Sequence, residues 1–163
     1  MKKFAAVLTA ALFLFQPAAA ECLITGENYG VGAAAAIVME AESGEVLFAQ
    51  EIHRQLPMAS TTKIMTALLT LEQPELRQEF TVDANAIQVE GSSMGLQTGD
   101  TVTLYALAVG MLLASGNDAA GAAAVRIGRS DEAFAEMMNR RAAQLGMNNT
   151  HFVTPSGLDA EEH

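Results

Sequence analysis

The sequence has almost no cysteine, no tryptophan and few basic side chains. Its 163 residues include a single cysteine, Cys22, so no disulfide can form within the chain. The absence of tryptophan, together with only two tyrosines, argues against an aromatic cage or a base-stacking platform. Nine lysine and arginine residues stand against 19 acidic ones, and the resulting formal net charge of -10 repels phosphate backbones. Composition therefore argues against nucleic acid as a partner.

Long hydrophobic runs are also scarce, and the one that is present lies at the N-terminus. Lys2 and Lys3 precede an apolar stretch over residues 4–15, and Pro17 separates that stretch from three alanines at 18–20. This order is typical of a secretory signal peptide, with cleavage expected after Ala20. The run is too short for a membrane-spanning helix, which needs about 20 apolar residues. We expect one exported domain over residues 21–163, in the periplasm or cell wall, with no membrane attachment encoded in this chain.

Hydrophobic periodicity and turn residues predict a β-hairpin followed by helices. Residues 41–44 are polar and end in glycine, which indicates the turn of the hairpin. Thr103 and Ser130 are expected to cap helices, and Gly146 is expected to end the last one. The almost wholly apolar segment 104–113 is expected to be buried, and the alanine-rich helix after it to pack closely. The expected strands cover residues 34–40 and 45–50, the expected helices cover 60–72, 104–113, 117–127 and 131–145, and residues 80–99 are expected to form short strands or irregular segments.

Lysine is rare among the side chains that could take part in catalysis. Beyond the expected signal peptide, Lys63 is the only lysine, whereas the other cations are arginines and three histidines. Arginine cannot release its proton near neutral pH, but a buried lysine can. Ser60 precedes Lys63 by three residues, and residues at this spacing are neighbours on a helix. Burial would lower the pKa of Lys63, and the free amine could then act as a general base toward the Ser60 hydroxyl.

A second polar segment, Ser115-Gly116-Asn117, lies between two expected apolar helices. Ser115 could pass a proton to a leaving amine, and Asn117 could donate to a substrate carbonyl and to Lys63. The alternative interpretations are structural: Ser60 caps a helix beside a solvated Lys63, and Asn117 or Asp118 caps the helix that follows. The three histidines are too scattered to predict a metal site, and no cofactor is expected.

The pair Ser60-x-x-Lys63 and Ser115-x-Asn117 resembles the first two of three motifs shared by penicillin-binding proteins and serine β-lactamases. Longer blocks narrow the resemblance to the D-alanyl-D-alanine carboxypeptidases of peptidase family S11, over a stretch from about Ala34 to the end of the chain. These blocks are residues 57–66, 91–96, 99–103, 110–120, 145–152 and 155–159.

The resemblance implies an α+β fold of the β-lactamase/transpeptidase-like class, with an antiparallel sheet and a helical subdomain. It implies that Ser60 attacks the carbonyl between the two D-alanines of a peptidoglycan stem peptide, while Lys63 takes the Ser60 proton. Ser115 would then shuttle a proton to the departing D-alanine, and Asn117 would position the substrate. No metal or organic cofactor would be needed, and β-lactam antibiotics would act as acylating mimics of the substrate.

One departure from the family pattern bears on activity. The third motif, K-T-G, is absent, because no lysine follows Lys63. We therefore expect a fragment or a truncated product with an incomplete sheet, whose 163 residues alone hydrolyse D-Ala-D-Ala peptides poorly or not at all. The alternatives are a catalytically inactive envelope protein of the same family and a serine β-lactamase. The second lacks support, because no glutamate between Ser115 and the end lies in a Glu-x-x-Leu-Asn context.

Overall fold

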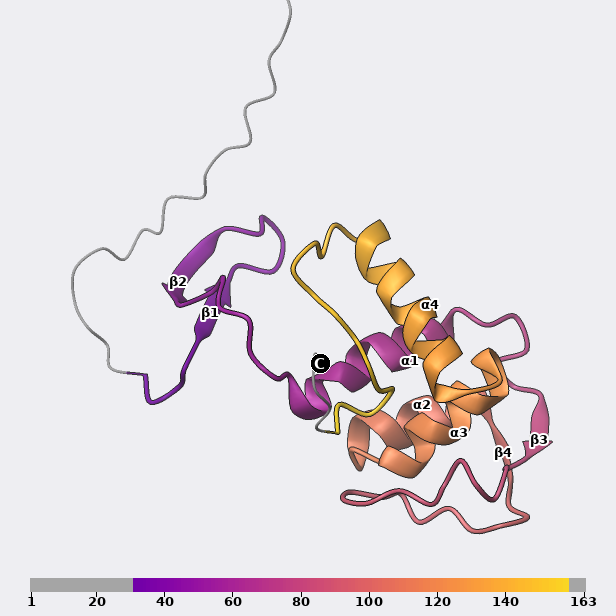
Figure 1. Ribbon diagram of the computed structural model, residues 1–163. Coiled ribbons are helices and arrows are strands. Elements are labelled where there is room, and N and C mark those ends of the chain that lie inside the picture. The colour runs from indigo at the N-terminus through magenta and orange to yellow at the C-terminus, as the bar shows by residue number, and fades with distance from the viewer. Residues whose placement is uncertain (1–30, 159–163) are drawn as a thin grey trace, which may run out of the picture. The chain divides into compact units, whose positions relative to one another are not determined.

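The chain divides between Arg54 and Gln55 into a small β-hairpin unit and a larger helical unit (Figure 1). The computed structural model describes residues 31–158. The expected signal peptide, Cys22 and the last five residues lie outside this range, so the expectations for them are not addressed by the structure.

The first unit is the predicted hairpin. Strand β1 (Ala36–Met39) pairs antiparallel with β2 (Val46–Gln50), and Val38 lies opposite Phe48. In the turn, the Glu40 carboxylate accepts a hydrogen bond of 2.7 Å from the Ser43 hydroxyl. This bond, with main-chain N–H donors of the same turn, lowers the pKa of Glu40 to about 2. The hairpin and the position of its turn are thus confirmed.

The second unit contains the helices. A 3-10 turn, η1 (Ala59–Thr62), leads directly into α1 (Lys63–Leu71). Two short strands, β3 (Glu79–Thr81) and β4 (Thr101–Thr103), pair antiparallel ahead of α2 (Leu104–Leu113). Helices α3 (Asn117–Gly128) and α4 (Asp131–Gln144) complete the unit.

The predicted caps of α2 and α4 are confirmed. The Thr103 hydroxyl accepts from the N–H of Ala106, and the Ser130 hydroxyl accepts from the N–H of Ala133, each at 3.1 Å. These bonds satisfy N–H groups that have no partner within the first turn of a helix. Gly146 follows α4 with a φ of +77°, a conformation that glycine adopts without strain.

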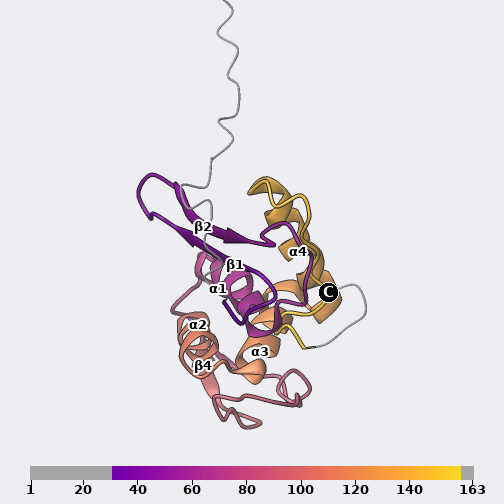
Figure 2. The same ribbon diagram turned by 90° about the vertical axis from the view of Figure 1, so that its left-hand side faces the viewer.

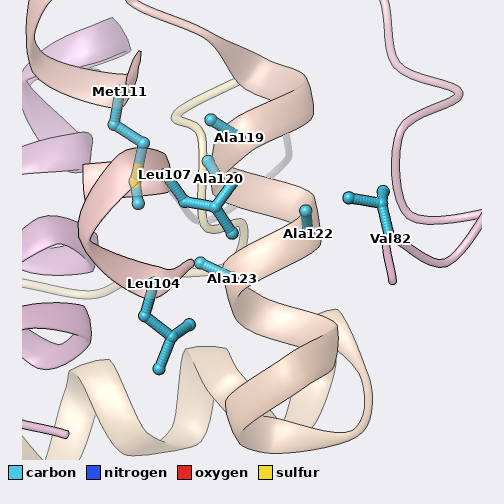
Figure 3. Close-up of a cluster of buried hydrophobic side chains, with 8 residues drawn as sticks. All are labelled: Val82, Leu104, Leu107, Met111, Ala119, Ala120, Ala122 and Ala123. Carbon is cyan, nitrogen blue, oxygen red and sulfur yellow. The ribbon is translucent and has the colours of Figure 1, made fainter. Parts of the chain in front are cut away.

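Helix α3 is the centre of this unit, and its small side chains allow close packing. It contacts α1, α2 and α4, and it lies beside α2 in both views of the ribbon (Figures 1 and 2). Figure 3 shows leucines and a methionine of α2 meeting the alanine face of α3. A Cβ at Gly121 would collide with the carbonyl oxygen of Ala86, so this helix tolerates no larger residue there. The cluster comprises Val82, Leu104, Leu107, Met111, Ala119, Ala120, Ala122 and Ala123.

Two sequence expectations for α2 and α3 are wrong. Helix α2 is buried on one side only, and Leu112 and Leu113 are 54% and 85% exposed. The helix is apolar all round, but packing against α1 and α3 covers only part of its surface. Neither Asn117 nor Asp118 is the N-cap of α3, because the extended residue before the helix is Gly116.

After α4 the chain returns along α1 (Figure 1), and polar side chains of two helices hold it there. The Asn139 amide donates to the carbonyl oxygen of Phe152 and accepts from its N–H, both at 2.8 Å. The Thr66 hydroxyl of α1 donates to the carbonyl oxygen of Pro155 at 2.6 Å. Residues 152–158 are thus fixed beside the start of α1. Within residues 31–158, no helix has the length and apolar character needed to cross a bilayer.

We expect Asn139→Ala to lower the free energy of unfolding by about 2 kcal/mol, because two part-buried hydrogen bonds between the Asn139 amide and the main chain of Phe152 are lost together. Denaturant unfolding measures this change. The control is Asn148→Ala at an exposed position, for which we expect little effect. Equal stability of the two variants would contradict this account of how the returning segment is held.

Candidate active site

Ser60 and Lys63 come together at the junction of η1 and α1. The Lys63 Nζ atom lies 3.1 Å from the Ser60 Oγ atom. Ser60 is exposed, whereas Lys63 is only 1% exposed. Ala59, directly before Ser60, has a φ of +46°, which is strained for a residue with a side chain. The turn thus presents a hydroxyl to solvent while the amine beside it is buried.

The surroundings of Lys63 favour the neutral amine. Besides Ser60, its Nζ donates to the carbonyl oxygen of Ser156 at 2.8 Å. Among residues 31–158, no carboxylate forms an ion pair with it. Burial lowers the pKa of Lys63 below its ordinary value of 10.5, because the charged form loses its hydration. The interpretation of Lys63 as a solvated residue is therefore wrong.

The carbonyl oxygen that meets Lys63 belongs to the returning segment, and glycine makes its approach possible. Gly157 has a φ of +78°. A Cβ at this position would overlap the carbonyl oxygen of Ala59 and lie 2.7 Å from the Thr62 hydroxyl. Residue 157 must therefore be glycine for the segment to pack against η1. Ser156 was not predicted as a site residue, although the Pro155-Ser156-Gly157 block in the sequence marks its position.

Ser115 lies in the short connection between α2 and α3, and Asn117 is the first residue of α3. Ser115 is half-buried and has a φ of +53°, so this candidate residue is itself in a strained backbone conformation. Asn117 is 5% exposed, and its amide Nδ2 donates to the carbonyl oxygen of Glu90 at 2.6 Å. Its main-chain N–H donates to the carbonyl oxygen of Ser92 at 2.7 Å.

The four predicted site residues thus fall into two pairs. A hydrogen bond joins Ser60 to Lys63, whereas Asn117 is held by the segment 90–92. Within residues 31–158, no hydrogen bond joins Ser115 or Asn117 to either member of the first pair, so the expected donation from Asn117 to Lys63 is not present in this structure. In the same range, no group of three or more histidine, cysteine or acidic side chains is arranged to hold a metal ion.

Comparison with known proteins identifies the family to which the chain belongs. Residues 23–163 match the family model described as D-alanyl-D-alanine carboxypeptidase, peptidase S11. The chain belongs to the S11 family. It is 36% identical over 136 residues to the D-alanyl-D-alanine carboxypeptidase DacF of Bacillus subtilis, an alignment that covers 80% of this chain and 35% of DacF. It is 40% identical over 123 residues to DacB2 of Mycobacterium tuberculosis, covering 76% of this chain and 42% of that relative.

A solved S11 structure agrees with the fold. The D-alanyl-D-alanine carboxypeptidase DacD of Francisella tularensis superposes with a TM-score of 0.78 at 33% identity, over 88% of this chain and 36% of that one. The expected α+β, transpeptidase-like fold class is thereby confirmed. The chain spans about two fifths of the length of the curated S11 relatives given above.

We expect the stability of this S11 protein to depend on pH through Lys63. Its pKa is lowered in the folded state, so between that value and 10.5 the unfolded chain binds more protons. The contribution of Lys63 to the free energy of unfolding therefore rises with pH across that window. It is lowest at the pH values at which the buried amine is charged. Lys63→Met removes this dependence.

Denaturant unfolding of both proteins from neutral pH to about 10 measures the effect. The unfolding free energy of the unchanged protein should rise relative to that of Lys63→Met as pH increases. Parallel curves, or a difference that falls with pH, would show that burial does not lower the pKa of Lys63.

Proposed function

We propose that the protein is a serine-type D-Ala-D-Ala carboxypeptidase that removes the terminal D-alanine from peptidoglycan stem peptides. The observation that carries the proposal is the buried Nζ of Lys63, 3.1 Å from an exposed serine hydroxyl and without a carboxylate partner within residues 31–158. Membership of the S11 family supports the reaction class, and the names of the curated relatives support the substrate class.

The first step is formation of an ester on Ser60. The Ser60 oxygen attacks the carbonyl carbon between the two D-alanines, and the neutral amine of Lys63 accepts the hydroxyl proton. The tetrahedral intermediate collapses by breaking the C–N bond. The departing amino group receives a proton and leaves as D-alanine, so the peptide remains attached to Ser60 as an acyl-enzyme.

The second step returns the enzyme to its starting state. Water attacks the ester, releases the shortened peptide as a carboxylic acid and gives a proton back to Ser60. Lys63 acts as the base for this water in the same way as for Ser60. No metal ion or organic cofactor takes part in either step.

Lys63 is suited to act as the base because two hydrogen-bond partners, the Ser60 hydroxyl and the Ser156 carbonyl oxygen, hold its Nζ atom in one position. Its hydrogen bond to the Ser156 carbonyl oxygen fixes the nitrogen without supplying a negative charge that would stabilise the ammonium. An arginine at this position could not take the proton, because its pKa is too high. Once deprotonated, the amine can accept the proton of a hydroxyl that already lies at hydrogen-bond distance.

Ser115 and Asn117 complete the proposed site. Ser115 passes the proton to the departing D-alanine, and Asn117 positions the substrate by donating to an amide carbonyl. Asn117 Nδ2 carries two hydrogens, and the bond to Glu90 uses one of them, so the other remains for a substrate. β-Lactam antibiotics would acylate Ser60 by opening of their ring. The stem-peptide substrate places the protein in the periplasm or cell wall.

Covalent labelling with a fluorescent penicillin tests this function. We expect the purified protein to be labelled, Ser60→Ala to give no labelling, and Lys63→Arg to reduce the rate at least ~100-fold although it keeps the positive charge. Ser43→Ala in the hairpin turn is the matched control and should be labelled at the unchanged rate. Labelling that survives in Ser60→Ala, or no labelling of the unchanged protein, would overturn the proposal, and the second result would favour a non-catalytic envelope protein.

A further inference from the structure

Asp118, in the first turn of α3, is a buried charge that the proposed reaction does not use. It is 1% exposed, and among residues 31–158 it is the only buried acidic side chain. No lysine, arginine or histidine in that range forms an ion pair with it. A buried carboxylate without a cation is costly unless hydrogen bonds replace its water.

Hydrogen-bond donors surround this carboxylate. Oδ2 accepts from a hydroxyl and two main-chain N–H groups, and Oδ1 accepts from two further N–H groups. Burial raises the pKa of Asp118, but these bonds, led by that of the Ser93 hydroxyl, outweigh the effect and lower it. The donors are Ser93 Oγ at 2.6 Å, Gly95 N at 3.0 Å and Leu96 N at 2.9 Å on Oδ2, and Met94 N and Ala119 N, both at 2.9 Å, on Oδ1.

Four of the five donors belong to one loop, residues 93–96, and this loop continues the segment that holds Asn117. Glu90 and Ser92 supply the two carbonyl oxygens that accept from the side chain and the N–H of Asn117. Gly91 lies between them, and a Cβ there would be 2.9 Å from Asn117 Nδ2. The carboxylate therefore anchors one end of a segment whose other end fixes the Asn117 amide.

We infer that Asp118 is a positioning residue for acyl transfer. Its carboxylate fixes residues 90–96, and these hold the Asn117 amide in the one orientation from which its second hydrogen can meet a substrate carbonyl. This inference rests on the proposed function of Ser60 and Asn117. A displacement of a positioning group by about 1 Å can reduce a rate by ~100-fold, so the anchor matters to the rate even though it touches no reacting atom.

Asp118→Asn is the most direct test, because it keeps the shape and removes an acceptor. In Asp118→Asn one of the two carboxylate oxygens becomes an NH₂ group, which cannot accept a hydrogen bond. The main-chain N–H groups that donate to that oxygen therefore lose their partner. We expect the rate constant of fluorescent-penicillin labelling to fall ~10-fold, while the final amount of label per folded molecule stays the same. A merely structural role would lower the amount of folded, labelled protein and leave the rate constant of that fraction unchanged.

Two further variants serve as a charge control and as a milder change at the same loop. Asp131→Asn removes the same charge from the first turn of α4, far from the site in sequence, and we expect an unchanged rate constant. Ser93→Ala keeps the charge and removes one hydroxyl, which donates to Asp118 at 2.6 Å and accepts from the N–H of Gly95 at 2.8 Å, so we expect about a threefold fall in rate. This variant decides the question if Asp118→Asn does not fold.

The outcomes separate the inference from the function on which it rests. Labelling of Asp118→Asn and Ser93→Ala at the unchanged rate would overturn the inference and leave the proposed function in place. Equal losses in Asp118→Asn and Asp131→Asn would also overturn it, because the cause would then be helix charge in general. Absence of labelling in the unchanged protein would overturn both.

Discussion

The amine of Lys63 is buried with a serine hydroxyl and a carbonyl oxygen as its hydrogen-bond partners, and the candidate chemistry depends on this placement. In water the amine would hold its proton at neutral pH and could not accept another. Burial penalises the charged form, and within residues 31–158 no carboxylate compensates for that penalty. The same burial that lowers the stability of the fold therefore favours the neutral form of the amine next to Ser60.

Several features of the helical unit serve to keep Lys63 in this position. The returning segment brings the Ser156 carbonyl oxygen to the amine, and Asn139 and Thr66 hold that segment from two different helices. Gly157 allows the segment to lie against η1 at a distance that no other residue permits. The small side chains of α3 allow α1 and α2 to pack closely against it, and the connection that carries Ser115 leads directly to Asn117 at its start.

Local signals in the sequence were sufficient for much of the fold. The hairpin turn at 41–44, the caps at Thr103 and Ser130 and the stop at Gly146 each depend on neighbouring residues, so the sequence predicted them correctly. The burial of α2 was overestimated because an apolar helix does not reveal which of its faces has a neighbour. The strand β4 was not predicted, since three residues are too few to show a periodicity.

The site shows the same division between local and distant contacts. Ser60 and Lys63 are three residues apart, and the spacing alone predicted that they would meet. The contact from Lys63 to Ser156 joins residues separated by 93 positions, and the loop around Asp118 lies more than 20 residues before it in the chain. Hydrophobic patterns carry no information about such polar contacts, so Asp118 was considered only as a possible cap and Ser156 not as a site residue.

Direct titration of Lys63 tests the central claim most simply. Lys2, Lys3 and Lys63 are the only lysines of the chain, so ¹³C labelling of lysine gives a spectrum in which the Lys63 side chain can be followed by NMR. A midpoint clearly below 10.5, lost when the protein is unfolded, is the result that the burial of this amine predicts. A midpoint at 10.5 or above in the folded protein would contradict the role of Lys63 as a base.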